Sequence, residues 1–267
     1  MSTEDWKDTF RPDIPSSARM YNYFLGGKDH YPADRDAAEE VLKVVPDIRT
    51  FALQNRAFLQ RAVRFLAGEV GIRQFLDVGA GLPSAGNVHE VAQGTAPDTR
   101  VVYVDNDPVV LAHGRNMLHG VENTTILRYD LQNPEGILAD GSLRNLLDLT
   151  EPVAVLLVAV VHFVTDAESP ADIVRRLMDP LPSGSYLALT HGTADSNPKA
   201  TEAAKVYERA TSRILPRPRA EVEGFFAGLE LAEPGLVWMP QWRPDQDTGL
   251  QDDPGRSMAY GGLARKP

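Results

Sequence analysis

The feature that most constrains the fold is an alternation of apolar runs and helical segments that begins at Gln74. Each run has the length and residue types of a buried β-strand, and the segments between the runs carry apolar residues at helical spacing. This alternation predicts an α/β fold, a doubly wound Rossmann-like sheet that is mainly parallel and covered by helices on both faces. The expected strands are QFLDVGA (74–80), VVYVDND (101–107), TTILRYD (124–130), VAVLLVAVV (153–161) and SYLALTHG (185–192), with helices at 88–93, 109–118 and 172–177.

The two ends of the chain extend this sheet. The late runs LVWMP (236–240) and SMAYGGLARK (257–266) have no helix between them, so they are expected to pair as an antiparallel hairpin at the sheet edge. The N-terminal part carries helical spacing and helix caps instead. We therefore expect a helical extension over residues 1–70 and a cofactor-binding domain over 71–267, with the N-terminal helices at 18–25, 33–44 and 47–68.

Composition excludes several classes of protein. The 267 residues include no cysteine, which excludes disulfides, thiol catalysis and cysteine-ligated metals. The longest apolar run, nine residues, is too short to span a bilayer, so no membrane partner is expected. The polar, acidic N-terminus does not resemble a signal peptide, and a cytoplasmic location is expected.

The charge of the chain also narrows its partners. A formal net charge of −10 disfavours nonspecific nucleic-acid binding, which needs lysine and arginine to neutralise phosphates. One local exception is RILPRPR (213–219), which carries three arginines. This stretch fits either a solvated loop or a contact with an anion.

The loop after the first strand suggests a nucleotide-type site. In FLDVGAGLPSAGNVHE (75–90), Gly79 and Gly81 allow a tight turn and close approach of a ligand to the backbone around Ala80. A dinucleotide fingerprint would place a further glycine three residues after Gly81, where this chain has Ser84. Two glycines alone also fit a plain tight turn.

Acidic residues at the next two strand ends strengthen the assignment. Asp105 ends the second apolar run, where a carboxylate can accept hydrogen bonds from both ribose hydroxyls, and Asn106 follows it. Asp130 ends the third strand and could accept from an adenine amino group. The alternative is that each acid is a solvated strand end or a helix cap, and Asp107 before Pro108 resembles such a cap.

A third acid, Asp77, lies inside the first apolar strand. A buried carboxylate is costly unless a cationic group lies nearby, and it would repel a pyrophosphate. Asp77 therefore favours S-adenosylmethionine (SAM), which has an ammonium and a sulfonium group but no phosphate, over a dinucleotide.

These motifs together resemble the class I SAM-dependent methyltransferases, whose sheet has the order 3-2-1-4-5-7-6 with strand 7 antiparallel. The blocks RPDIPSSARMYNYFLGGKDHYPADRDAAEEVL, QNRAFLQRAVRFLA and FLDVGAGLPSAGNVHEVAQ resemble, more closely, an actinobacterial family of S-adenosyl methyltransferases, formerly a domain of unknown function. The resemblance covers nearly the whole chain and does not identify a substrate. It implies cofactor contacts at the methionine end (Asp77, Gly79, Ala80, Gly81), the ribose (Asp105, Asn106) and the adenine (Asp130, Leu131).

The N-terminal block precedes the sheet and could fold over the cofactor as a lid that excludes water. Tyr23 offers an aromatic surface for a sulfonium or a substrate ring, and Gly27 allows close backbone approach. Lys28 or Arg56 could pair with the methionine carboxylate. The alternative is that this block only packs on the sheet domain.

Two histidines follow neighbouring strands. His162 comes after the fourth strand and His191 ends the fifth, so both are expected at the same edge, near the transferred methyl group. Either could be a general base or contact the substrate, although each could equally satisfy a backbone group. Methyl transfer can also proceed by proximity when the acceptor is already nucleophilic. No spacing of ligands suggests a metal site.

The sequence therefore predicts a SAM-dependent methyltransferase that acts on a small-molecule acceptor. Two alternatives remain: a non-catalytic SAM-binding regulatory protein and, on the same fold, an NAD(P)-dependent oxidoreductase. No oligomeric state is predicted.

Overall fold

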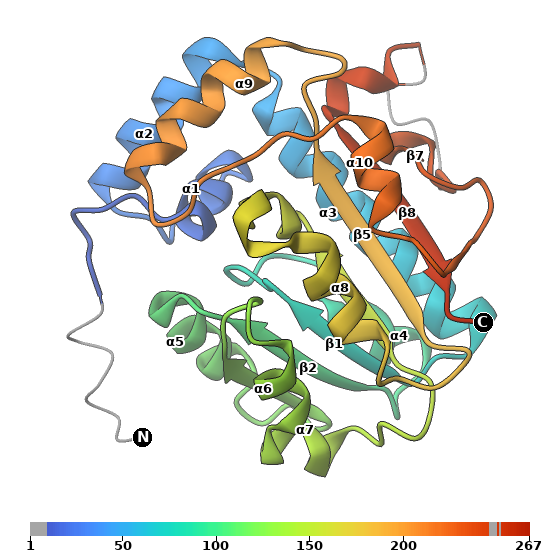
Figure 1. Cartoon of the computed structure of the whole chain (residues 1–267). Coiled ribbons are helices and arrows are strands. Elements are labelled where there is room, and N and C mark those ends of the chain that lie inside the picture. Colours follow the sequence, from blue (N-terminus) through green and yellow to red (C-terminus); the bar gives the residue numbers. More distant parts are fainter. Residues whose placement is uncertain (1–9, 246–249, 251) are drawn as a thin grey trace.

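A single mixed sheet forms the centre of the computed structural model, which describes residues 10–245, 250 and 252–267 (Figure 1). Its strands are β1 (Gln74–Val78), β2 (Arg100–Asp105), β3 (Thr124–Arg128), β4 (Ala154–Val158), β5 (Tyr186–Gly192), β6 (Glu230–Leu231), β7 (Val237–Trp238) and β8 (Ala259–Arg265). They are ordered β3-β2-β1-β4-β5-β8-β6, and β7 pairs with β8 beside this path.

The predicted topology is confirmed. Strands β1 to β5 are all parallel to one another, and the last strand, β8, runs antiparallel between β5 and β6. The two late strands do pair antiparallel, at Val237–Gly261 and Trp238–Tyr260. They are not a hairpin at the edge, however, because β8 pairs along its whole length with β5. Only the short β6 and β7 lie outside it, and the two-residue β6 has too few residues to show a pattern in the sequence.

Helices form where the caps and periodicity predicted them, within a few residues. Among the connecting helices, α5 begins at Pro108. The side chain of Asp107, the residue before it, accepts a hydrogen bond from the Val109 N–H. The short helices α6, α7, α9 and α10 were not predicted. The helices are α1 (Ser17–Phe24), α2 (Pro32–Val44), α3 (Ile48–Arg64), α4 (Val88–Thr95), α5 (Pro108–Met117), α6 (Pro134–Ala139), α7 (Gly141–Leu146), α8 (Pro170–Met178), α9 (Lys199–Ala204) and α10 (Arg219–Gly224).

The sheet is buried on both faces because side chains alternate along each strand. Phe75 of β1 packs in one core with Phe58 of α3 and Leu263 of β8. Its neighbour Leu76 points the other way, into a second core with Leu177 of α8. Figure 1 shows α8 in front of the sheet and α3 behind it. The central strands are therefore apolar on both sides, as the sequence predicted.

The helices α1, α2 and α9 lie together beyond the carboxyl ends of the parallel strands (Figure 1). Arg19 of α1 and Asp34 of α2 form a buried ion pair at 2.8 Å, and the Ser16 hydroxyl donates to Asp107 at 2.6 Å. These contacts join α1 to α2 and to the start of α5. The three helices form a roof over the strand ends. Within the described residues, no helix is long and apolar enough to cross a membrane.

Candidate active site

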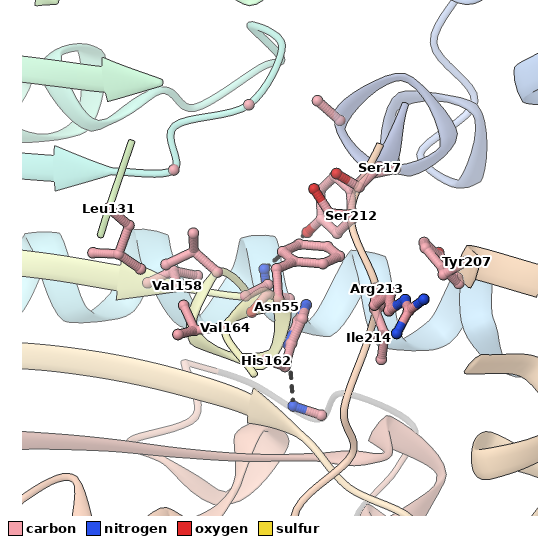
Figure 2. Close-up of a pocket in the computed structure, with 18 of the residues that line it drawn as sticks. Ser17, Asn55, Leu131, Val158, His162, Val164, Tyr207, Ser212, Arg213 and Ile214 are labelled. Carbon is pink, nitrogen blue, oxygen red and sulfur yellow. Dashed lines mark hydrogen bonds between the residues drawn. The ribbon is translucent and has the colours of Figure 1, made fainter. Parts of the chain in front are cut away.

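A cavity of about 570 Å³ lies between the roof helices and the carboxyl ends of the strands (Figure 2). Its walls come from the loops after β1, β2, β3, β4 and β5, from α1, α2, α3 and α9, and from the segment that follows α9. A volume of this size is typical of sites that enclose a cofactor or another small ligand. The cavity lies where ligands bind in open α/β sheets, outside the carboxyl ends of the strands.

The glycine loop forms one end of the cavity. Gly79 and Gly81 have φ values of +78° and +67°, which side chains other than glycine rarely adopt. The N–H groups of Gly79 and Ala80 both donate to the Val104 carbonyl of β2, at 2.8 and 3.2 Å. A Cβ on Gly79 would lie 2.3 Å from Val160 Cγ2, whereas one on Gly81 would have no atom within 4 Å. A side chain at position 79 would therefore collide with Val160, whereas the space beside Gly81 is open.

Asp105 at the end of β2 supports this loop. Its carboxylate accepts from the Gly81 N–H and from the Asp107 N–H, both at 2.9 Å, while it lines the cavity. Burial raises the pKa of Asp105 to about 6, against the opposing effect of these hydrogen bonds. Since a carboxylate can accept about four hydrogen bonds, Asp105 retains lone pairs for a ligand. Asp107, by contrast, is the helix cap that the sequence suggested.

Asp77 is buried in the wall of the cavity, and no hydrogen-bond donor from the described residues reaches its carboxylate. Burial raises its pKa to about 7; the nearby Arg56 guanidinium lowers it, and the negative charge of Asp105 raises it further. A buried carboxylate that receives no hydrogen bond is stabilised in its ionised form by a cationic ligand group.

Arg56 of α3 provides a cation close to Asp77. Its Nη2 donates to the carbonyl oxygens of Ala85 and Gly86, at 3.3 and 3.0 Å, which holds the side chain against the glycine loop. Its Nε is buried with no hydrogen-bond partner. Since a buried, unpaired donor is costly, this nitrogen is suited to bind a ligand carboxylate.

Asp130, Asn106 and Leu131 line the cavity beside Asp105, in the loops after β2 and β3. The Asn106 side chain donates to Asp130 Oδ2 at 2.8 Å, and the Gln132 N–H donates to Asp130 Oδ1 at 2.9 Å. The hydrogen bond between Asn106 and Asp130 joins the loops after β2 and β3. Leu131 is buried and supplies an apolar surface beside them.

The N-terminal block reaches the cavity, but through different residues from those predicted. Tyr23, Gly27 and Lys28 do not line it. Tyr23 donates its hydroxyl to Glu39 and packs on His30, and Lys28 is exposed. Gly27 packs against Asn22 instead, where a Cβ would lie 2.4 Å from the amide. The helical period explains the difference for Tyr23: the lining residues Tyr21 and Phe24 share one face of α1, and Tyr23 lies on another.

A chain of hydrogen bonds connects this face of α1 to the sheet. The Ala159 N–H donates to the Thr190 hydroxyl at 2.8 Å, and this hydroxyl in turn donates to Asn55 Oδ1 at 2.6 Å. Asn55 Nδ2 then donates to the Tyr21 hydroxyl at 2.9 Å, which donates to the Ala52 carbonyl at 3.0 Å. Asn55 and Thr190 were not predicted as site residues, because no local pattern in the sequence marks either one.

The two predicted histidines lie together, with ring centroids 5.6 Å apart, but they differ in access. His191 does not line the cavity, because strand alternation turns it away from the side on which Thr190 meets α3. Arg217 donates to its Nε2 at 3.1 Å, so its Nδ1 carries the proton and donates to the Gly192 carbonyl at 2.8 Å. Burial lowers the pKa of His191 to about 4. Both nitrogens are occupied, so His191 is unsuited to act as a base.

His162 lines the centre of the cavity (Figure 2). Its Nδ1 accepts from the Gly192 N–H at 3.4 Å, which places the proton of the neutral ring on Nε2. Burial lowers the pKa of His162 well below its usual value, and the neighbouring His191 and the positive charge of Arg217 act in the same direction. His162 is therefore a neutral hydrogen-bond donor. Among the described residues, no group of three or more His, Asp or Glu side chains could hold a metal ion.

Comparisons with known proteins point to one family. A profile of a family described as S-adenosyl methyltransferase matches residues 4–267. The crystal structure of a DUF574 family protein from Streptomyces avermitilis is 45% identical and has a TM-score of 0.92, with 96% of this chain and 100% of that chain covered. A candidate methyltransferase from Thermobifida fusca is 40% identical with a TM-score of 0.90, and the match covers 95% of this chain and 96% of that one.

More distant structures share the fold alone. The N-methyltransferase NodS from Bradyrhizobium japonicum is 11% identical with a TM-score of 0.50, over 82% of this chain and 97% of that chain. A comparison with functionally curated proteins gives no significant match.

Proposed function

The chain belongs to the S-adenosyl methyltransferase family, and we propose that its acceptor is a small molecule held in the cavity under the roof helices. Membership makes the protein a SAM-dependent methyltransferase with a class I fold. The observation that carries the proposal is the enclosure of the cavity. Of the helices over it, α1 is joined to α5 by the Ser16–Asp107 contact and to α2 by the Arg19–Asp34 ion pair, and α9 packs against α2. A macromolecular acceptor would have to displace them.

We propose the following placement of the cofactor. Asp77 binds the methionine ammonium and Arg56 the carboxylate, because each presents a buried polar group without a partner. Gly79, Ala80 and Gly81 let the backbone approach the methionine end. The ribose hydroxyls donate to Asp105, beside Asn106, and the adenine lies between Asp130 and Leu131. The buried acid Asp77 beside the glycine loop would repel a pyrophosphate, which disfavours a dinucleotide.

The chemistry of transfer follows from proximity and orientation. The bound cofactor supplies an electrophilic methyl group, which a nucleophile attacks by in-line displacement. His162 donates a hydrogen bond from Nε2 and so orients an oxygen or nitrogen of the acceptor. Since neither histidine is placed to accept a proton there, the acceptor must react through a lone pair that is already available, as in an amine or an ionised hydroxyl.

Thermal shifts with SAM, S-adenosylhomocysteine and NAD test the cofactor assignment. We expect stabilisation by the first two and none by NAD, and Asp105→Ala should remove the stabilisation because the ribose loses its acceptor. Asp98→Ala is a matched control, since Asp98 is an exposed acid on the same domain. A shift with NAD alone would exclude the proposed site, and unchanged binding by Asp105→Ala would exclude Asp105 as the ribose acid.

Turnover separates the enzyme from a binding protein. Release of S-adenosylhomocysteine with a panel of small phenols, amines and acids is expected from the wild type. Methylation of a denatured protein extract, but of no small molecule, would contradict the small-molecule proposal.

A further inference from the structure

We propose that the acceptor has an apolar, flat body and an acidic group, and that Arg213 and Tyr207 bind that acidic group. This inference rests on the proposed methyl transfer and adds the chemical class of the acceptor. It comes from the half of the cavity that the cofactor residues do not occupy. In Figure 2, Leu131 lies on one side of His162, while Tyr207, Arg213 and Ile214 lie on the other.

A segment that crosses the cavity builds this second half. Residues 211–217 run from the start of α1 to the ends of β4 and β5, held by three backbone bonds. The N–H groups of Thr211, Leu215 and Arg217 donate to the carbonyls of Pro15, His162 and Gly192, at 2.9, 2.8 and 3.2 Å. Arg213 is thus two residues from the bond to His162. It lies on the β4–β5 side of the cavity, away from β1 to β3.

Arg213 is the member of the three-arginine stretch that remains available. Arg217 is buried and binds His191 and Asp166, and Arg219 donates to the Leu236 carbonyl and lies over Tyr260. Arg213 lines the cavity and makes no ion pair or hydrogen bond with any described residue. A guanidinium with free donors at a cavity wall is suited to bind a carboxylate.

Tyr207 provides an independent polar group. Its side chain is 5% exposed and lines the cavity, and its hydroxyl has no hydrogen-bond partner among the described residues. Burial raises its pKa above the ordinary value near 10, so the hydroxyl keeps its proton and can donate. A buried hydroxyl without a partner is costly, and a ligand acceptor atom would satisfy it.

Much of the remaining surface in this half is apolar. It is lined by Val41 of α2, Val45 just after α2, Phe51 of α3, Phe163 after β4 and Ile214, and the Phe163 and Tyr207 rings lie 6.5 Å apart. These side chains fit a flat apolar body.

Charge then orients the acceptor within the cavity. The cofactor half carries Asp77, Asp105 and Asp130, which repel an acid, and its one cation among the described residues, Arg56, is assigned to the methionine carboxylate. The other half presents Arg213. The acidic end therefore binds at Arg213 and Tyr207, and the opposite end, with the nucleophile, points toward His162.

Matched acids and amides test this inference. The probes are 4-hydroxybenzoate with 4-hydroxybenzamide and 4-aminobenzoate with 4-aminobenzamide, measured by calorimetry in the presence of S-adenosylhomocysteine and by turnover with SAM. We expect each acid to bind about tenfold more tightly than its amide, the size of one charge-assisted pair. The preference should weaken at high salt, because Arg213 is exposed.

Variants assign the effect to residues. Arg213→Gln should raise KM for the acids about tenfold and abolish the preference over the amides, with kcat and SAM affinity unchanged, and Arg213→Lys should restore part of it. Tyr207→Phe should weaken binding of the acids only a fewfold, since it removes a neutral donor. Arg209→Gln is the matched control, because the exposed Arg209 pairs with Glu40 and does not line the cavity.

Equal binding of acids and amides, or no binding by any acid while SAM binds, would overturn the inference. Loss of SAM affinity in Arg213→Gln would also overturn it and assign Arg213 to the cofactor. Failure of the wild type to bind SAM at all would instead overturn the proposed function.

Discussion

At the scale of single residues, Asp77 shows how binding requirements oppose stability. The carboxyl is buried without a hydrogen-bond donor from the described residues, and its pKa is raised to about 7. An aspartate in the unfolded chain titrates near 3.9, so the folded state binds this proton more tightly. The free energy of unfolding contributed by Asp77 therefore falls as pH rises from about 4 to about 7.

Replacing Asp77 by asparagine should stabilise the protein without cofactor. We expect Asp77→Asn to raise the free energy of unfolding by about 1–3 kcal/mol at pH 8, within the limit of about 1.4 kcal/mol per pKa unit, and by almost nothing near pH 4. Urea denaturation at the two pH values measures this. A variant less stable than the wild type at pH 8 would contradict the account.

Cofactor binding should respond to pH in the opposite direction. Because the ammonium binds the ionised form of Asp77, SAM affinity should fall as pH drops below about 7, by up to tenfold per pH unit. Asp105, whose pKa is raised to about 6, adds to the loss at lower pH. Asp77→Asn should bind SAM weakly with a flatter pH profile in titration calorimetry, and an unchanged profile would exclude Asp77 as the ammonium partner.

The two glycines of the loop make a matched pair. Alanine at Gly81 meets no atom within 4 Å and is expected to cost about 1 kcal/mol from its positive φ alone. Alanine at Gly79 also collides with Val160, so we expect a loss of about 2–4 kcal/mol. Denaturant midpoints of Gly79→Ala and Gly81→Ala measure the difference, and equal losses would mean that the loop moves freely away from Val160.

At the scale of elements, the position of α1 depends on a buried network around Asp34. Its carboxylate accepts from the Arg19 guanidinium and from the N–H groups of Ser16 and Tyr31, at 2.7–2.8 Å. Arg19 is 2% exposed, and Asp34 is its nearest anion, with Asp107 Oδ2 at 4.0 Å. The network joins the start of α1 to the start of α2 and holds both helices over the cavity.

Neutralising this acid should loosen the roof. We expect Asp34→Asn to destabilise the protein by about 3–4 kcal/mol, because it leaves the buried Arg19 guanidinium without its nearest anion. The variant should also bind SAM more weakly. Asp36→Asn on the exposed face of the same helix should change stability by less than about 0.5 kcal/mol. Chemical denaturation and calorimetry of the pair test this; similar stabilities for the two variants would show that Asp34 is not essential for the roof.

At the scale of the whole molecule, the predicted extension over residues 1–70 shares its core with the sheet. Phe58 and Ala62 of α3 pack in the same apolar cluster as Phe75 and Leu263. We therefore propose that α1 and α2 form part of the roof over the cavity, and that the described residues before the sheet fold together with it as one cooperative unit.

Calorimetry of the full chain tests this. We expect one transition whose calorimetric and van't Hoff enthalpies agree. Phe58→Ala should lower that single transition, at a cost of about 3–5 kcal/mol. Leu53→Ala, in the same helix but 56% exposed, should leave it nearly unchanged. Two separate transitions would contradict the proposed unit.

The sequence by itself determined the buried strands and the edge of the sheet at which the proposed cofactor residues lie. Apolar runs specify buried strands, and Gly79, Gly81, Asp105 and Asp130 lie at strand ends, so local order along the chain is enough to bring them to one edge. Their distances in sequence did not matter, because parallel strands align their carboxyl ends.

Only the tertiary structure decided the roof and the acceptor half. Whether Tyr21 or Tyr23 faces the cavity depends on how α1 packs. The hydrogen bond that occupies His191 Nε2 depends on Arg217, which comes from a later segment. The contact of Asn55 with Thr190 joins residues from α3 and β5 that no local pattern relates. These features arise from packing between distant segments, which periodicity and motif spacing do not encode.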